Sequence, residues 1–560
     1  MTLPDLLWSS PAQAGELCAW CKQPSKRQCG GCGTVTYCSG EHQKEHWNQH
    51  RDECNAYRVL SNDRVGRYGV ATRTLEPGEQ VLTELPFVIG PKPDSYVMCL
   101  GCYARVDGST LCSRCRWPVC GPKCEAAPCH AKAECPVFET AKVRFQSMEN
   151  YMDACPQLNC IAPLRLLLAK DSNPERWESE VKFMETHNEK RRQTPIWENN
   201  QINVVEYLRS PCKLAARFDE ELIHMACGIL EVNSFEVRCP NGSAVQGFYP
   251  RTAIMSHNCV PNTSHCIATT DGIVCFRLIL RTTVKIEKGS EIYITYTHTL
   301  NPTPLRRDHL KQGKFFDCIC SRCSDPTELG TNMSSLKCNK CDPGLIMSSD
   351  PLDPLAQWKC THCEFCTPGS AVKRVFSVVQ RDLDELDYMD TGVEAVEKRE
   401  ALCRKYRSVL HPKHAFLATL QYSLSQLYGH AQGYSLEDLP DILLQRKLEL
   451  CKDVLSVADI IEPGLSRLRG LILYELHAPA VLLARNQWRY KEIDDKKLRI
   501  RLEEAEKYLK EAVHILKFEH PSSPEGRIAA IGEKSLQQLR ESIESLPKSQ
   551  GSLSAETILV

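Results

Sequence analysis

The sequence has almost no excess charge of either sign and no long apolar run. Lys and Arg number 69 against 70 Asp and Glu, which gives a formal net charge of −1. A neutral balance removes the bulk attraction to phosphate that non-specific nucleic-acid binding needs, so we expect no direct nucleic-acid partner. No stretch reaches the roughly 18 apolar residues that could cross a membrane, and the N-terminal segment 1–15 lacks the basic and apolar regions of a secretory signal. We therefore expect no membrane association and a location in the cytoplasm, the nucleus or both.

Cysteine is the residue present in excess, with 32 in 560 residues and many in C-x2-C pairs. Inside a cell such pairs bind metal more often than they form disulfides, and we favour metal sites over a secreted disulfide scaffold. The length and the 42% hydrophobic content leave room for several packed domains.

The first cysteine cluster occupies residues 18–54. Its close pairs of soft ligands are Cys18 and Cys21, Cys29 and Cys32, Cys38 and His42, and His50 and Cys54. A segment this short cannot bury enough apolar surface to fold alone, so two zinc ions would hold it together. The spacing resembles a MYND finger, in which the first and third pairs share one zinc and the second and fourth share the other. His46 competes with His42, and the family spacing favours His42.

A second cluster of the same kind spans residues 99–135. Its pairs are Cys99 and Cys102, Cys112 and Cys115, Cys120 and Cys124, and His130 and Cys135, and Cys129 beside His130 is a possible substitute. Further along, Cys338, Cys341, Cys360 and Cys363 have the C-x2-C-x18-C-x2-C spacing of a zinc ribbon, and Cys366 is a spare.

A third kind of spacing, C-x-C-x2-C, supplies Cys318, Cys320 and Cys323, one ligand short of a tetrahedral zinc site. Cys259 can be the fourth ligand. Zinc binding in small structural motifs contributes about 10–16 kcal/mol, which exceeds the entropic cost of closing the intervening loop. The sequence therefore predicts a metal clip that joins 316–323 to 257–262 and closes any pocket between them. Counting all clusters, about six zinc sites use 21 of the 32 cysteines and three histidines.

The segments between the clusters differ in their periodicity. Residues 61–90 alternate apolar and polar side chains around a tight turn and predict short strands, and 229–237 predicts another strand. Residues 136–225 show helical spacing, with the basic run 190–192 on a solvated helix face.

Beyond residue 368 the sequence predicts helices as far as about 547, with breaks at Pro412, Gly433, Pro463 and Pro521. Helices paired at this interval resemble tetratricopeptide (TPR) hairpins. The apolar stripes are read as hairpin packing in preference to a partner groove. The last dozen residues, 549–560, predict a flexible tail.

Three motifs in order carry a family resemblance. SHNCVPN at 256–262, GSEIYITY at 289–296 and KFFDCICSRC at 314–323 resemble the signature segments and cysteine-rich tail of SET-domain methyltransferases. With its fingers the chain resembles the SMYD (SET and MYND) family over nearly its whole length. The resemblance implies an α+β fold with these parts: MYND-type finger 18–54, split SET domain 61–300 with finger 99–135 and helical insertion 136–225, post-SET segment 301–323, zinc ribbon 330–366, and TPR-like all-α domain 370–547.

The resemblance also implies an activity, S-adenosylmethionine-dependent N-methylation of lysine in histone or non-histone proteins. Such an enzyme must align a methyl sulfonium with an amine, present that amine uncharged, and exclude water. By resemblance Tyr296 would be the catalytic residue, and the residues that bind the cofactor would be Gly66, Arg67, Asn233, Ser256, His257, Tyr296 and Phe316. Asn262 would satisfy backbone groups where the two segments cross.

Three positions depart from the family pattern. Tyr68 stands in place of a glycine, Ser256 in place of an asparagine, and Lys314 where an aromatic channel wall is usual. The alternative function is a weak or inactive SET/MYND scaffold whose fingers bind peptide motifs and recruit transcriptional corepressors. In either case we expect a monomer with a protein substrate or peptide-motif partners, and a possible further partner at the C-terminal helices.

Overall fold

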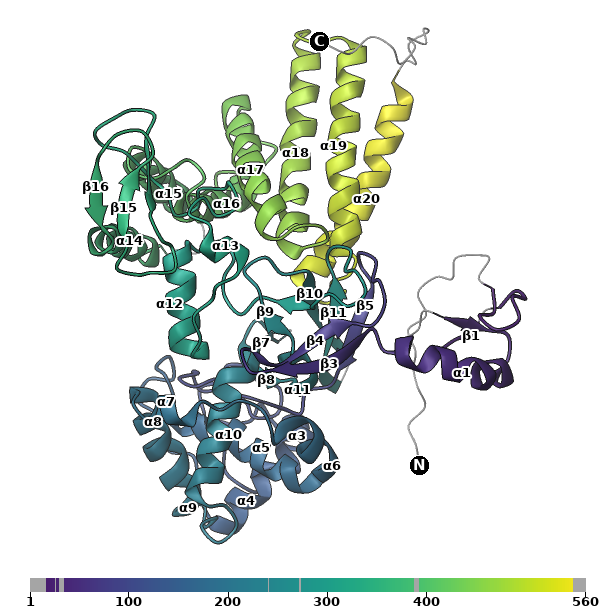
Figure 1. The fold of residues 1–560 in the computed structure, drawn as a ribbon, viewed down its shortest axis with the longest axis vertical. Helices are drawn as coiled ribbons and strands as arrows, with labels where there is room; N and C mark the ends of the chain where they lie inside the picture. Colours follow the sequence, from purple (N-terminus) through teal and green to yellow (C-terminus); the bar gives the residue numbers. More distant parts are fainter. Residues whose placement is uncertain are drawn as a thin grey trace.

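The chain folds into a series of metal-binding and helical units around a set of short sheets. The computed structural model describes residues 17–25, 27–29, 35–239, 241–270, 273–386 and 392–546. Cys32, the N-terminal segment 1–15 and the tail 549–560 lie outside these residues. Figure 1 shows the N-terminal finger at one side of the molecule, the inserted helices at one end, and the long C-terminal helices at the other.

The elements alternate between short strands and helices until residue 368, and those described after it are all helices. The strands are β1 (Arg27–Gln28), β2 (Thr36–Tyr37), β3 (Tyr57–Asn62), β4 (Gly66–Ala71), β5 (Gln80–Glu84), β6 (Val88–Gly90), β7 (Ser234–Arg238), β8 (Ala244–Phe248), β9 (Ser256–His257), β10 (Thr263–Thr270), β11 (Ile273–Thr282), β12 (Tyr293–Ile294), β13 (Leu336–Lys337), β14 (Leu345–Ser348), β15 (Gln357–Cys360) and β16 (Cys366–Pro368). The helices as far as β7 are α1 (Gly40–Cys54), α2 (Pro122–Glu125), α3 (Pro128–Ala131), α4 (Glu134–Ala141), α5 (Ile161–Ser172), α6 (Pro174–Arg176), α7 (Asn188–Arg191), α8 (Pro195–Asn200), α9 (Tyr207–Arg209) and α10 (Glu220–Asn233), with tighter or wider helical turns at Pro156–Cys160, Trp177–Val181 and Gln201–Glu206. The later helices are α11 (Pro250–Ala253), α12 (Thr303–Lys314), α13 (Ser321–Ser324), α14 (Gly369–Asp384), α15 (Val393–Tyr406), α16 (Ala415–His430), α17 (Asp441–Ile461), α18 (Arg467–Arg489), α19 (Asp495–Leu516) and α20 (Pro524–Ser545).

The central strands form several small sheets in place of one large one. The order β10-β11-β5 and the order β6-β8-β7 are antiparallel, and β3 pairs with β4. The exception is the parallel pair of β9 and β12, in which Ser256 lies opposite Tyr293 and His257 opposite Ile294. A parallel pair needs a long crossover, and here β10 and β11 supply it. The crossover brings two of the signature segments side by side.

The inserted helices correct two predictions from the sequence. The stretch 229–237 is not one strand, because α10 continues to Asn233 and only Ser234 onward is extended. Ile229, Leu230 and Val232 are buried on this helix. The same apolar run would also suit a strand, but in the structure it packs with helical spacing. The basic run 190–192 is only in part a solvated face, since Lys190 and Arg192 are exposed but Arg191 is not. Arg191 is fully buried and its Nη2 lies 2.6 Å from a Glu231 carboxylate oxygen.

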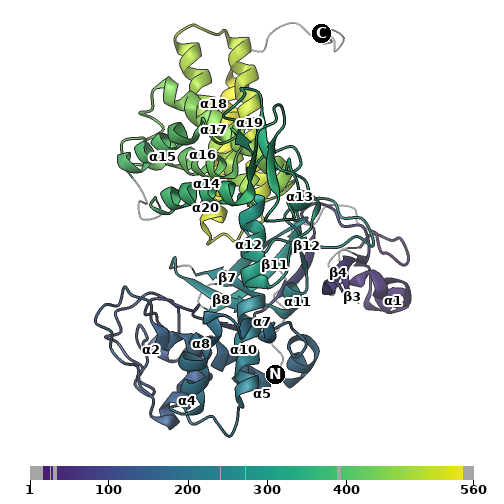
Figure 2. The same cartoon turned by 60° about the vertical axis from the view of Figure 1, so that its left-hand side comes forward.

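The C-terminal half is an array of antiparallel helices, seen side by side for α17 to α20 in Figure 1 and again after rotation in Figure 2. The predicted breaks at Pro412, Gly433, Pro463 and Pro521 all fall in the connections between these helices. Each helix buries an apolar stripe against its neighbours, so the stripes are used in packing between helices.

The turn between α17 and α18 joins this array to the central sheets. The Leu465 N–H donates to the Thr283 carbonyl at 2.8 Å, and Arg467 Nη2 donates to the His265 carbonyl at 2.8 Å. Gly464, the residue before Leu465, has φ +75°, and a Cβ there would lie 2.0 Å from the Thr283 carbonyl oxygen. Only glycine fits so close a contact.

Within the described part of the chain, no helix combines the length and the apolar composition needed to cross a membrane.

Candidate active site and metal centres

The metal clip predicted between two distant segments has its four sulfurs in one place. The ligand atoms of Cys259, Cys318, Cys320 and Cys323 all lie within 4.8 Å of one another, and three of the four residues are buried. The Cys259 sulfur is 3.5 Å from that of Cys323 and 4.0 Å from that of Cys318. Four thiolates in a compact group are the donor set of a structural zinc site, so these residues fit a tetrahedral zinc ion.

A buried ionic cluster surrounds this group of sulfurs. Arg306, Arg322 and Glu328 are each at most 1% exposed. One Glu328 carboxylate oxygen accepts from Arg306 at 2.8 Å and from Arg322 at 3.0 Å, and the other accepts from the Thr303 N–H at 3.1 Å. Burial acts to raise the pKa of Glu328, but the two guanidinium groups outweigh it and lower the pKa to about 2. The cluster is therefore ionised and closely packed.

Tyr296 lies next to the clip, on the segment that follows β12. Its hydroxyl donates to the Met255 carbonyl at 2.5 Å, and burial raises the pKa of the phenol. Its backbone N–H donates to His257 Nδ1 at 3.0 Å. The centre of the His257 ring lies 5.3 Å from that of Tyr296 and 5.9 Å from that of Phe316. A tyrosine hydroxyl, a backbone carbonyl and two aromatic rings thus line one spot beside the sulfurs.

Asn262 performs the structural task expected of it. Its amide nitrogen donates to the Glu291 carbonyl at 2.9 Å, and its amide oxygen accepts from the Tyr293 N–H at 2.7 Å. Both bonds join the segment after β9 to the segment that leads into β12, so the prediction that Asn262 satisfies backbone groups at the crossing is confirmed.

Arg67 and Asn233 contact the helical insertion, and Gly66 precedes Arg67 on β4. Gly66 begins β4 with φ +70°, which a residue with a side chain rarely adopts. Arg67 donates to the Phe183 carbonyl at 3.0 Å, and Asn233 donates to the Glu185 carbonyl at 2.9 Å. Both side chains are thus held by the segment between the Trp177–Val181 turn and α7.

Lys314 ends α12 and lies beside Tyr296. Its Nζ donates to the Val232 carbonyl at 2.6 Å and is 5.8 Å from the centre of the Tyr296 ring. Burial lowers the pKa of this amine to about 8. The position where the family usually has an aromatic residue therefore places an amine with a lowered pKa beside Tyr296.

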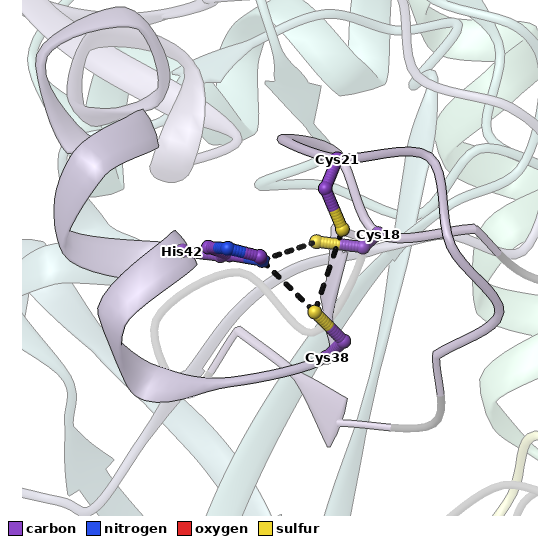
Figure 3. Close-up of side chains that lie close together, drawn as sticks. All are labelled: Cys18, Cys21, Cys38 and His42. Atoms are coloured by element: carbon purple, nitrogen blue, oxygen red, sulfur yellow. Dashed lines mark hydrogen bonds between the residues drawn. The ribbon is translucent and has the colours of Figure 1, made fainter.

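The N-terminal finger gathers its first and third ligand pairs. Cys18, Cys21, Cys38 and His42 form one group, drawn in Figure 3, in which His42 Nδ1 lies 2.9 Å from the Cys38 sulfur. His46 is engaged elsewhere, since its Nδ1 is 2.9 Å from the Tyr37 hydroxyl. Of the second and fourth pairs, the sulfurs of Cys29 and Cys54 lie 3.7 Å apart, and His50 is buried on α1.

The second finger has the same interleaved arrangement but is built into the core. One group contains Cys99, Cys102, Cys120 and Cys124, and the other contains Cys112, Cys115, His130 and Cys135. Cys129 is in neither group, since its thiol faces the Gly101 carbonyl oxygen at 3.3 Å.

His130 connects this finger to α5 through a buried carboxylate. Its Nδ1 lies 2.7 Å from a Glu134 oxygen, and Glu134 in turn accepts from Arg165 at 2.7 Å. Arg165 also donates to the Ile89 carbonyl on β6 at 3.0 Å. A carboxylate behind a metal-binding histidine fixes which ring nitrogen faces the metal. The second finger is thus held by the central sheets, whereas the first lies to the side in both views (Figures 1 and 2).

The ribbon residues Cys338, Cys341, Cys360 and Cys363 form a further group at one end of the sheet β13-β14-β15-β16. All four are partly exposed, and Cys366 on β16 is exposed and outside the group.

The sequence reasoning missed Arg306, Glu328 and Met255. No local pattern marks them, because their roles depend on contacts between segments far apart in the chain. The run of two arginines at 306–307 was the only available signal, and such a run is usually solvated.

Comparisons with known proteins agree with these observations. The family model for the MYND finger matches residues 18–54. The SET domain-containing protein SmydA-8, isoform A, of Drosophila melanogaster is 29% identical over 339 residues, which cover 59% of this chain and 69% of that protein. The N-lysine methyltransferase SMYD2 of Gallus gallus is 30% identical over 252 residues (40% and 50%), and the histone-lysine N-methyltransferase ASHR1 of Arabidopsis thaliana is 25% identical over 434 residues (73% and 83%).

Proposed function

We propose that this chain, which belongs to the SMYD family of SET- and MYND-domain proteins, is an S-adenosylmethionine-dependent protein-lysine N-methyltransferase. The observation that carries the proposal is the partly buried Tyr296, whose hydroxyl donates to the backbone carbonyl of Met255 next to the cysteine clip. Two relatives, SMYD2 and ASHR1, are named as lysine methyltransferases.

The cofactor would supply an electrophilic methyl group, and residues around the crossing of β9 and β12 would hold it. Ser256 and His257 would bind it through backbone groups, and the Phe316 ring would lie against its adenine. Gly66 would let the backbone approach the amino-acid end, with Arg67 and Asn233 at the same edge. Tyr296 would orient the incoming amine. The aromatic and backbone groups that line this spot suit a flat, polar nucleoside.

The acceptor amine must be uncharged to act as a nucleophile, although a free lysine side chain has a pKa of about 10.4. A site that withholds water lowers that pKa. Burial acts in the same direction on Lys314 beside Tyr296, whose pKa it lowers to about 8. The same lysine carries positive charge at neutral pH and would repel an acceptor that is still protonated. Transfer by this chain should therefore favour mildly alkaline conditions.

Calorimetry with S-adenosylmethionine, followed by transfer of a labelled methyl group to a panel of histone and non-histone proteins, tests the proposal. We expect cofactor binding and labelling of at least one protein on lysine. Tyr296→Phe should abolish labelling with cofactor affinity nearly unchanged, because the backbone and Phe316 remain. Absence of cofactor binding would refute the proposal, and unchanged labelling by Tyr296→Phe would remove Tyr296 from its role.

The metal content is a separate part of the proposal. The five groups of ligands described above, together with Cys29, Cys32, His50 and Cys54, would bind six zinc ions. Elemental analysis of the purified protein should therefore give about six zinc per chain.

A second function is favoured by one observation, the position of the N-terminal finger at the side of the molecule (Figure 1). As a scaffold, the chain would use this finger to hold peptide motifs of partner proteins, including transcriptional corepressors, in the nucleus or cytoplasm. We propose that the chain acts as a monomer in either role. Cofactor binding without labelling of any protein would favour the scaffold.

A further inference from the structure

Arg306 is a fully buried arginine whose N–H groups face two sulfurs of the clip. Its Nε lies 3.3 Å from the Cys259 sulfur, and its Nη2 lies 3.5 Å from the Cys323 sulfur. A guanidinium presents its donors in a rigid fork, so both contacts can be made at once. The other donors of the guanidinium have oxygen acceptors, in the Asn301 carbonyl, the Glu328 carboxylate and the Thr303 hydroxyl, so the sulfurs complete its hydrogen bonding.

The charge of the clip explains why such a residue belongs there. Four thiolates around a divalent zinc ion leave an excess of two negative charges in a buried place, and uncompensated buried charge is costly. Arg306 supplies positive charge at the sulfurs. It is itself oriented by Glu328 at 2.8 Å and by the Thr303 hydroxyl at 2.8 Å.

The contact continues from Cys259 to the proposed transfer site. His257 Nδ1 accepts the Tyr296 N–H at 3.0 Å, so the ring proton is on Nε2, which lies 3.3 Å from the Cys259 sulfur. The Cys259 sulfur thus receives N–H groups from Arg306 on one side and His257 on the other. A single row of hydrogen bonds joins Arg306 to the backbone of Tyr296.

The ribbon site provides a contrast within the same chain. Its sulfurs receive backbone donors, with the N–H groups of Lys340 and His362 at 3.3 Å from Cys338 and Cys360. Its four cysteines are partly exposed, whereas Cys259 and Cys323 are fully buried. Among the interactions described for the ribbon sulfurs there is no guanidinium.

We propose that Arg306 is a positioning residue of the clip: its guanidinium fixes the thiolates of Cys259 and Cys323 and, through His257, the backbone at Tyr296. The two thiolates then have reduced reactivity, because hydrogen bonds to sulfur lower its electron density. This inference depends on the cysteines binding zinc and does not depend on methyl transfer.

The test uses the zinc-loaded full-length protein and measures thiol alkylation. Treatment with N-ethylmaleimide, followed by peptide mass spectrometry, gives a rate for each cysteine. In the Arg306→Lys protein, Cys259 and Cys323 should be alkylated about 10- to 100-fold faster than in wild type. This is the range expected for loss of a charged hydrogen bond. The ribbon cysteines should keep their wild-type rates.

The matched control is Arg307→Lys, on the same helix. Arg307 binds the backbone carbonyls of Cys318 at 3.1 Å and Leu352 at 2.7 Å, and the contacts described for it include no sulfur. It should leave the alkylation rates of Cys259 and Cys323 unchanged. Hydrogen exchange adds a second readout, since the peptide that contains Tyr296 should exchange faster in Arg306→Lys and not in Arg307→Lys.

Unchanged alkylation of Cys259 and Cys323 in a folded Arg306→Lys protein would overturn the proposal, as would equal effects of the two substitutions. Wild-type protein alone supplies a further check that needs no variant. Its ribbon cysteines should react before those of the clip, and the reverse order would also overturn the proposal. None of these measurements involves the cofactor, so a failure here is distinct from a failure of the proposed activity.

Discussion

Replacement of Glu328 by glutamine is expected to destabilise the protein strongly. The Glu328 carboxylate is the only one described that forms an ion pair with either of the two buried arginines, at 2.8 Å from Arg306 and 3.0 Å from Arg322. Glutamine keeps the shape but removes the carboxylate charge that pairs with both buried guanidinium groups. Removing one partner from a buried ion pair costs about 3–5 kcal/mol, and we expect Glu328→Gln to fall in this range at pH 7.

The pH dependence of the stability provides a second, independent test of this prediction. The pKa of Glu328 is lowered from 4.5 to about 2, so the carboxylate stabilises the folded state above its unfolded pKa, and this stabilisation is lost as the pH falls through 4.5 toward 2. The stability of Glu328→Gln should therefore fall less steeply over that range than that of wild type. Urea unfolding, followed by fluorescence and circular dichroism, measures both effects. Because zinc is released from wild type and variant alike at low pH, the two proteins are compared with each other at each pH.

An exposed pair serves as the control for the Glu328 experiment. Glu178 and Lys182 are 2.8 Å apart, with 60% and 48% of their side chains exposed. Glu178→Gln should cost less than about 1 kcal/mol, as solvent-exposed pairs do. If Glu328→Gln were no more destabilising than Glu178→Gln, the central role assigned to the ionic cluster would be wrong.

Three further substitutions test other parts of the molecule. Lys314→Met should raise stability in urea at pH 7, and the gain should shrink as the pH rises from about 8 to 10.5, because the wild-type amine then loses its charge in the folded state first; a gain that is independent of pH would contradict this. His42→Ala should remove one zinc per chain by elemental analysis, whereas His46→Ala should retain it; the opposite result would exchange their roles. Arg165→Met leaves the buried Glu134 without its guanidinium and should lower the free energy of unfolding in urea by about 3–5 kcal/mol. A loss below about 1 kcal/mol would contradict the role given to the buried contacts between His130, Glu134 and Arg165.

The metal groups could be predicted from the sequence because ligand spacing is a local property. The pairs of the two fingers and of the ribbon repeat at intervals that a single ion can bridge, and the structure brings their described members together. Cys259 could be predicted only indirectly, because no local spacing marks it as a ligand. The C-x-C-x2-C group lacks a fourth ligand, and Cys259 can supply it.

Other features could not be predicted because they depend on contacts between distant segments. The apolar run before Asn233 suits a strand or a helix, and packing against the insertion selects the helix. Arg191 lies in a basic run that is typical of solvated faces, but Glu231 on α10 provides the partner that allows its burial. Two partners of Arg306, Glu328 and Cys259, are likewise 22 and 47 positions away in sequence.

The tight turn at Gly464 has a consequence for how a bound protein would meet the proposed active site. Since Leu465 and Arg467 are hydrogen-bonded to the central strands on the far side of that turn, the long C-terminal helices have little freedom to swing. A protein docked on those helices would present its chain to the neighbourhood of Tyr296 across a fixed span. The distance between the docking segment and the target lysine in a bound protein would then decide which lysine is selected. Lengthening the connection between α17 and α18 would change that distance.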